Sequence, residues 1–216
     1  PWAGNSSRRE EYPDFSPEGD QIAFVSDRYA DGCGGLDCIF VADLDGKNLT
    51  ILTPEIEELA GAENTTPVWS PDGEWIAYYR LFLMDDKLNQ EAGGLWLVKP
   101  DGSEGHRVAF IEDLWFHPAK PIWSPDGQWL LCEVSGNLEQ NQLHMWLVPS
   151  AGGEPVDIVY PNAQLFIPSW SPDSKFILFS RYSESEGYGL YVYRIGDGDW
   201  YPLVDSGMAA FGVWSK

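Results

Sequence analysis

The stretch Pro67-Val68-Trp69-Ser70-Pro71-Asp72-Gly73-Glu74-Trp75-Ile76-Ala77-Tyr78 decides the fold of this chain. Apolar residues stand on both sides of a four-residue segment, Ser70 to Gly73, that is typical of a tight turn. Proline fixes φ at the second position, aspartate hydrogen-bonds to nearby backbone, and glycine accepts a positive φ. The pattern therefore predicts two antiparallel strands joined by a short turn.

The same pattern recurs along the chain. Copies begin at Pro121 (PIWSPDGQWLL) and Pro168 (PSWSPDSKFILF), a looser copy begins at Pro13 (PDFSPEGDQIAF), and a fifth begins at Gly212. The aromatic residue before the serine stands at positions 15, 69, 123, 170 and 214, so the spacings are 54, 54, 47 and 44 residues. Internal repeats of roughly this length are typical of propeller blades or of a solenoid.

Each repeat has apolar segments for four strands. In the second repeat we expect strands at about 66–69, 74–80, 95–99 and 106–110, with a hairpin turn at Asp101-Gly102. The other repeats fit the same frame, and no segment has a convincing helical period. The prediction is an all-β propeller of four-stranded antiparallel blades, with four repeats and the first strand of a fifth.

This frame resembles the TolB-like propeller repeat, in which a Trp-Ser-Pro-Asp-Gly turn precedes an apolar strand, a Ser-x-Arg motif and a strand ending in Asp-Gly. Ser26-Asp27-Arg28, followed by Ile39 to Gly46, matches that order closely. The resemblance covers residues 12–216, with Glu18 in place of Asp and Ser174 in place of Gly as departures. It implies a ring of six to eight blades that is periplasmic and binds protein partners.

The repeats divide the chain into a lead-in at 1–11 and blades at about 12–65, 66–119, 120–166 and 167–210, with a partial blade at 211–216. We interpret this as an incomplete ring, completed by further sequence or by another chain. A closed ring of four blades is the alternative.

Composition limits the classes of partner. The 216 residues carry a formal net charge of −21, which argues against a nucleic-acid binder and against docking on an anionic membrane. The longest apolar runs have four or five residues, such as Leu95 to Val98, so we expect no membrane insertion. The charge favours a cationic protein or peptide partner. Residues 1–11 lack the pattern of a signal peptide; the alternative is that one has been removed, because the sequence does not begin with Met.

Three cysteines bear on the cellular compartment. Cys33 and Cys38 flank a short glycine-rich segment, and we predict a disulfide between them; two reduced thiols are the alternative. A disulfide there suits an oxidising compartment, so we expect an extracytoplasmic protein, either periplasmic or secreted and at the cell surface. Cys132 stands in a predicted strand and is expected to be a buried small hydrophobe.

The candidate binding surface is the face that carries the long, varied loops. In a four-stranded meander the short turns emerge at one end, and the longer loops, 27–37, 54–65, 81–94, 111–120, 136–144, 161–167, 182–189 and 205–210, emerge at the other. These loops are acidic, which suits either plain solvation or a cationic partner. Function concentrates on varied loops held by a rigid scaffold.

Aromatic and basic residues in these loops are the candidate partner contacts: Trp115, Phe116, His117, Arg28, Tyr29, Tyr182 and Tyr188. Large aromatic side chains often carry much of the binding energy at protein interfaces. The alternative for Trp115 and Phe116 is that they fold inward and fill space between blades.

Sequence patterns for catalysis are missing from the chain. It has no Gly-x-Ser-x-Gly nucleophile elbow and no His-Glu-x-x-His zinc motif, and its three histidines, at 106, 117 and 144, lie far apart. Asp43 to Asn48 resembles the start of a calcium loop but lacks its later ligands, and a hairpin turn is expected there. We therefore expect no metal, no cofactor and no enzymatic activity.

The sequence thus favours a non-catalytic propeller that binds a protein or a ligand through its acidic loop face. One alternative is the gating propeller of a prolyl-oligopeptidase-type serine peptidase, whose catalytic residues lie in a separate α/β-hydrolase domain. Another is a structural subunit of a cell-surface complex.

Overall fold

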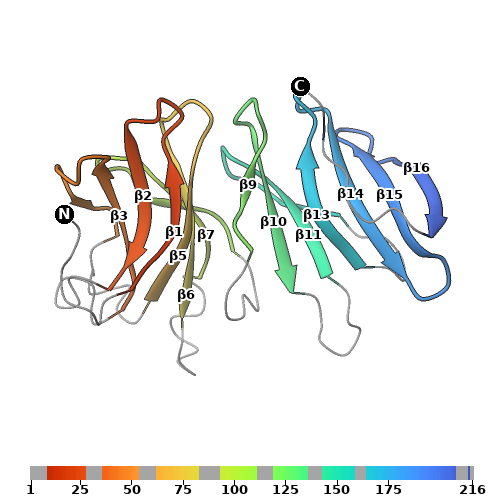
Figure 1. Cartoon of the computed structure of the whole chain (residues 1–216), viewed down its shortest axis with the longest axis horizontal. Coiled ribbons are helices and arrows are strands. Elements are labelled where there is room, and N and C mark those ends of the chain that lie inside the picture. The colour runs from red at the N-terminus through yellow and green to blue at the C-terminus, as the bar shows by residue number, and fades with distance from the viewer. Residues whose placement is uncertain are drawn as a thin grey trace.

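A computed structural model describes residues 9–27, 36–53, 62–82, 93–110, 119–135, 143–158, 164–207 and 214. Within these ranges the chain forms sixteen β-strands and no helix. The strands make four antiparallel sheets of four consecutive strands each. The sheets lie side by side in chain order (Figure 1). The all-β prediction and the four-stranded blades are confirmed for this part of the chain.

The bounds of the strands follow the repeats. The first two sheets contain β1 (Glu10–Phe15), β2 (Gln21–Ser26), β3 (Cys38–Asp43), β4 (Thr50–Ile51), β5 (Ala62–Trp69), β6 (Ile76–Phe82), β7 (Gly94–Val98) and β8 (His106–Ala109). The last two contain β9 (Ile122–Trp123), β10 (Trp129–Ser135), β11 (Leu143–Pro149), β12 (Val156–Ile158), β13 (Gln164–Trp170), β14 (Phe176–Ser183), β15 (Gly187–Arg194) and β16 (Trp200–Gly207).

The Ser-Pro-Asp-Gly segments form the turns that the sequence predicts. In the second sheet, Ser70 donates its hydroxyl to Oδ1 of Asp72 at 2.5 Å and accepts the backbone N–H of Trp75 at 3.0 Å. Gly73 has a φ of 73°, in the left-handed region that glycine adopts without strain. Ser124 and Ser171 make the same pair of side-chain hydrogen bonds in the next two sheets. One local motif therefore closes the first hairpin of each of these three blades.

Apolar side chains fill the space between neighbouring sheets. Alternate residues of each strand point to opposite faces, so each sheet contributes to two interfaces. Ile39 and Tyr78 belong to the cluster between the first and second sheets, Leu97 and Leu130 to the next, and Phe179 to the last. These side chains are almost completely buried, and the hydrophobic effect therefore holds each blade against the next.

A tryptophan hydrogen bond repeats from blade to blade. Nε1 of Trp123 donates to the carbonyl of Val68 at 3.3 Å, and Nε1 of Trp170 donates to the carbonyl of Ile122 at 3.3 Å. Trp214 makes the same bond with Ser169 at 2.9 Å. Trp214 therefore makes with the fourth sheet the same hydrogen bond that Trp170 makes with the third. The number of blades in a complete ring stays a prediction, as do the blade boundaries.

Several strand ends differ from the sequence expectation. The predicted loop at 182–189 is a tight hairpin, because β14 continues to Ser183 and β15 begins at Gly187. Strand β1 begins at Glu10, inside the predicted lead-in, and β5 begins at Ala62, inside the predicted loop 54–65. These strands run further because continued pairing satisfies backbone N–H and C=O groups that the side-chain pattern does not reveal.

Candidate functional site

The predicted contact residues fall into two groups. Arg28, Tyr29, Trp115, Phe116 and His117 lie outside the described residues, so their predicted role stays a prediction. Tyr182 and Tyr188 are described, and they lie in strands β14 and β15 and not in a loop.

Tyr182 and Tyr188 form a cross-strand pair. They are register partners in the β14–β15 hairpin, and their ring centroids are 4.8 Å apart. Tyr188 is exposed and Tyr182 is half-buried. The pair is an aromatic surface at the long-loop end of the fourth sheet, the end at which the sequence predicts binding.

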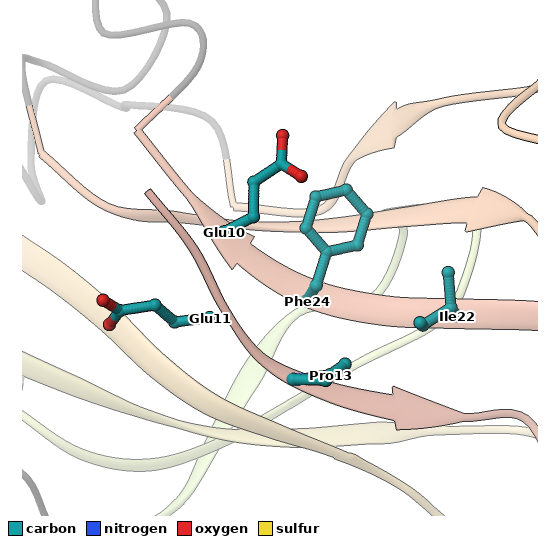
Figure 2. Close-up of a pocket in the computed structure, with 5 residues that line it drawn as sticks. All are labelled: Glu10, Glu11, Pro13, Ile22 and Phe24. Atoms are coloured by element: carbon teal, nitrogen blue, oxygen red, sulfur yellow. The ribbon is translucent and has the colours of Figure 1, made fainter. Parts of the chain in front are cut away.

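A pocket of about 140 Å³ lies on the first sheet. Pro13, Ile22 and Phe24 give it an apolar wall, and the acidic residues Glu10 and Glu11 complete its lining (Figure 2). Ile22 and Phe24 lie on the face of this sheet that points away from the second sheet, next to the cluster that contains Phe40. An apolar wall with acidic groups suits a side chain with an apolar stem and a cationic head.

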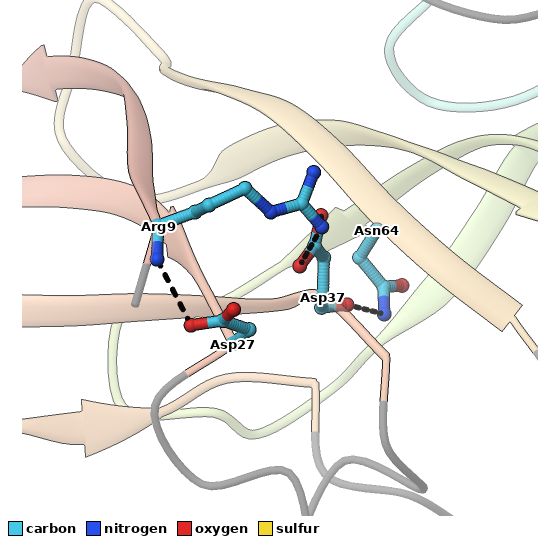
Figure 3. Close-up of polar contacts among 4 residues, drawn as sticks. All are labelled: Arg9, Asp27, Asp37 and Asn64. Atoms are coloured by element: carbon cyan, nitrogen blue, oxygen red, sulfur yellow. Dashed lines mark hydrogen bonds and ion pairs between the residues drawn. The ribbon is translucent and has the colours of Figure 1, made fainter. Parts of the chain in front are cut away.

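A polar cluster ties the first sheet to the second. The backbone N–H of Arg9 donates to Oδ1 of Asp27 at 3.1 Å, and its guanidinium lies 3.2 Å from both carboxylate oxygens of Asp37 (Figure 3). The backbone carbonyl of Asp37 accepts both the backbone N–H and the side-chain amide of Asn64, each at 3.1 Å. Asn64 in β5 thereby fixes the segment that leads into β3.

Burial shifts two pKa values in opposite directions, that of Asp37 in this cluster and that of the neighbouring Arg80, which is hydrogen-bonded to Asn64. It raises the pKa of the Asp37 carboxyl above its usual range, although the charge of Arg9 acts in the opposite sense. It lowers the pKa of the Arg80 guanidinium, with a smaller opposing effect from Tyr78. Both shifts have the same physical origin, since burial removes the water that stabilises a charge.

Arg80 extends the cluster into the interior. Its side chain is 6% exposed, and its Nε–H donates to Oδ1 of Asn64 at 2.9 Å. The guanidinium carbon lies 4.5 Å from the ring centroid of Trp96 and 5.6 Å from that of Tyr78. A buried cation is thus held between an amide and two aromatic rings.

Arg181 occupies the corresponding place in the fourth sheet. It is 2% exposed, and its guanidinium carbon lies 4.7 Å from the ring centroid of Tyr191. Its Nη2 donates to the Glu186 carboxylate and to the hydroxyl of Ser183. Each arginine stands ten residues after the serine that opens its blade's turn, Ser70 or Ser171. That spacing is the sequence signal that could have found these two residues, which sequence reasoning missed.

The states of Cys38 and Cys132 agree with the sequence expectation, and that of Cys33 is not described. Cys38 is buried and disulfide-bonded, whereas Cys132 is a free, buried thiol. Burial raises the pKa of the Cys132 thiol to about 12, which removes it as a nucleophile at neutral pH. Cys33 lies outside the described residues, so its pairing with Cys38 stays a prediction.

The described part of the chain offers neither a group of metal ligands nor a membrane-spanning helix. No group of three or more His, Cys, Asp or Glu residues there could hold a metal ion. No helix there is long and apolar enough to cross a membrane.

Comparison with known proteins adds one sequence relative and many structural ones. No family model matches the chain. Over 150 residues it is 26% identical to the uncharacterized peptidase YuxL of Bacillus subtilis (strain 168), a match that covers 54% of this chain and 22% of that protein. The chain therefore spans less than a quarter of the curated relative.

Solved structures share the fold at low sequence identity. TolB from Acinetobacter baumannii superposes with a TM-score of 0.61 at 15% identity, over 94% of this chain and 45% of that one. A prolyl endopeptidase gives a TM-score of 0.62 at 15% identity, over 92% and 30%. An oligogalacturonate lyase in complex with manganese gives 0.62 at 14%, over 94% and 55%. The fold is that of a β-propeller.

These relatives correct one expectation. The sequence led us to expect no enzymatic activity, but the curated relative is a peptidase, and the structural neighbours include a lyase, an endopeptidase and a dipeptidyl aminopeptidase. The expectation was wrong because it treated missing motifs as evidence. A propeller carries no nucleophile elbow of its own, and the chain matches only 22% of the peptidase.

Proposed function

We propose that this propeller is the part of a peptide-hydrolysing enzyme that receives and orients peptides. The observation that carries the proposal is the 26% identity to peptidase YuxL over 150 residues. In prolyl-oligopeptidase-type peptidases a propeller gates an active site whose catalytic residues lie in a separate hydrolase domain. The same separation of a gating propeller from a catalytic domain would account for a chain that has propeller repeats and no catalytic motif.

The described surface supports a peptide ligand. The Tyr182–Tyr188 pair offers aromatic area at the long-loop end, and the pocket beside Phe24 has an apolar wall next to the acidic residues Glu10 and Glu11. The packed interfaces between the sheets make a rigid scaffold for such groups. With a formal net charge of −21, the chain favours peptides that carry positive charge.

An extracytoplasmic location is part of the proposal. It is supported by the disulfide at Cys38, because disulfides persist in oxidising compartments and are rare in the cytosol of mesophiles. Extracellular or periplasmic peptides would then be the substrates.

The test uses the protein in its native, full-length form. The native protein is labelled with a fluorophosphonate probe, which reacts with activated serines, and is assayed with chromogenic peptides that contain proline, alanine or lysine before the scissile bond. We expect one labelled serine outside these 216 residues, and peptide cleavage that the probe abolishes. A native protein that neither reacts with the probe nor cleaves any of these peptides would overturn the proposal.

A further inference from the structure

Two blades contain the same buried arginine site. Arg80 lies in β6 and Arg181 in β14, at equivalent positions of the repeat. Each guanidinium lies over an aromatic ring of the adjacent third strand, Trp96 in β7 or Tyr191 in β15, with carbon-to-centroid distances of 4.5 and 4.7 Å. The site is therefore a repeated feature of the fold and not an accident of one blade.

A glycine is the register partner of each arginine on the third strand. The register partner of Arg80 on β7 is Gly94, and the register partner of Arg181 on β15 is Gly189. A Cβ added to Gly189 would lie 2.9 Å from the Tyr191 ring, which is closer than real contacts allow. In both blades the aromatic residue follows the glycine by two positions, so it lies on the same face as the arginine.

The two sites differ in their counter-charge. Arg181 donates to the Glu186 carboxylate, which the β14–β15 hairpin supplies. Within the part of the chain that the structure describes, Arg80 forms no ion pair, and its hydrogen bond is to the neutral amide oxygen of Asn64. The same buried cation thus has a carboxylate in the fourth sheet and lacks one, among described residues, in the second.

A buried guanidinium without a counter-ion is costly. Removal from water penalises the charge, which the lowered pKa of Arg80 reflects, and a carboxylate repays that penalty best. The planar guanidinium presents its N–H groups in a fork that matches the two oxygens of a carboxylate. Trp96 and Tyr78 hold the fork in place, so little side-chain freedom is lost on binding.

We propose that Arg80 binds a carboxylate of a peptide ligand at the long-loop end, between the first and second sheets. The proposal rests on the proposed function, because it takes the ligand to be a peptide. It adds a specificity that net charge does not predict: on a strongly acidic protein, one site favours an anionic group. The carboxylate is either the peptide's C-terminus or an acidic side chain.

Two pairs of probes separate these sources. The first pair is the peptide Ala-Ala-Pro-Ala with a free C-terminal carboxylate and the same peptide with a C-terminal amide. The second pair is Ala-Glu-Pro-Ala-amide and Ala-Gln-Pro-Ala-amide. Binding to the native full-length protein, with any active serine blocked by fluorophosphonate, is measured by isothermal titration calorimetry. We expect the carboxylate member of at least one pair to bind about tenfold tighter or more.

Two variants of Arg80 and one of Arg181 locate the effect. R80M should remove the preference for the carboxylate, and R80K should retain only part of it, because lysine lacks the planar fork. R181M is the matched control, because it removes the equivalent arginine whose carboxylate the chain itself supplies. It should leave the preference unchanged. Circular dichroism of each variant checks that it is folded.

The outcomes separate this inference from the proposed function. Equal affinity for acid and amide in both pairs, or a preference that survives R80M, would overturn the carboxylate site, even if the protein cleaves peptides. A preference that R80M abolishes supports the site, even if the fluorophosphonate test fails. In that case the ligand is bound and not hydrolysed.

Discussion

Lys120 and Asp14 are 106 residues apart in the chain, yet Nζ of Lys120 lies 2.5 Å from Oδ1 of Asp14. Oδ2 of the same carboxylate accepts the backbone N–H of Trp69 at 2.7 Å. One side chain of β1 therefore contacts β5 of the second sheet and the residue that lies shortly before β9 of the third. Since β1 and β5 are edge strands of their sheets, Asp14 satisfies a backbone donor that no ladder partner reaches.

Replacing Asp14 should therefore weaken the contacts between three blades. We expect D14A to lower the free energy of unfolding by about 1–3 kcal/mol, because a backbone N–H and a half-buried ammonium lose their acceptor. Urea unfolding followed by tryptophan fluorescence measures this. The control is K47A, which breaks the exposed Lys47–Asp45 pair and should leave the free energy of unfolding nearly unchanged, because water screens an exposed ion pair. Equal losses for the two variants would contradict the bridging role of Asp14.

The tryptophan hydrogen bonds between blades can be tested with a matched pair. Trp170 donates its Nε1–H to the carbonyl of Ile122, whereas the buried Nε1 of Trp69 has no acceptor among the described residues. Both side chains are buried to a similar degree, 8% and 6% exposed. Tryptophan to phenylalanine removes about the same ring area at each site, so the difference reports the hydrogen bond. We expect W170F to be about 1 kcal/mol more destabilising than W69F in urea unfolding. Equal effects would show that the bond contributes nothing.

Ser174 occupies the turn position that is glycine in the other repeats, and a hydrogen bond to the neighbouring blade accounts for the serine. Its φ is 58°, in the left-handed region, and its hydroxyl accepts the backbone N–H of Asp126 from the neighbouring blade at 3.0 Å. S174A should cost about 1–2 kcal/mol, because it keeps the backbone strain and loses the bond. S174G loses the same bond but relieves about 1 kcal/mol of strain, so it should cost less. Thermal or urea unfolding measures the stability of both variants. A less stable S174G than S174A would contradict this account.

Thiol counting tests the cysteine assignments. At pH 8 the native chain should not react with iodoacetamide, because Cys132 is buried and its pKa is raised to about 12, while Cys38 is disulfide-bonded. Denatured without reductant, this chain should titrate one thiol, that of Cys132; after reduction all three cysteines should react. Three thiols in the unreduced, denatured chain would mean that Cys33 and Cys38 are not paired.

The blades could be predicted from sequence because their information is local. The Ser-Pro-Asp-Gly turns need only their own residues, as the bonds from Ser70 to Asp72 and Trp75 show. The end of β14 was predicted poorly, since continued pairing with β15 to Ser183 satisfies backbone groups and leaves no mark in the apolar pattern. The candidate contacts were chosen by residue type, and the aromatic pair Tyr182–Tyr188 is the part of that choice that the structure places together.

What the sequence by itself determined is the repeat: its spacing, its turns and the alternation that makes four-stranded sheets, all of which depend on residues close together in the chain. The tertiary structure alone decided which side chains meet across blades. The Asp14 carboxylate accepts a hydrogen bond from Lys120, and the Ser174 hydroxyl accepts one from the backbone N–H of Asp126. The buried Arg181 pairs with the Glu186 carboxylate, whereas the equivalent Arg80 has no carboxylate partner among the described residues. Such contacts depend on how the sheets stack, because only packing brings residues that are tens of positions apart within hydrogen-bonding distance and excludes the water that would otherwise satisfy them.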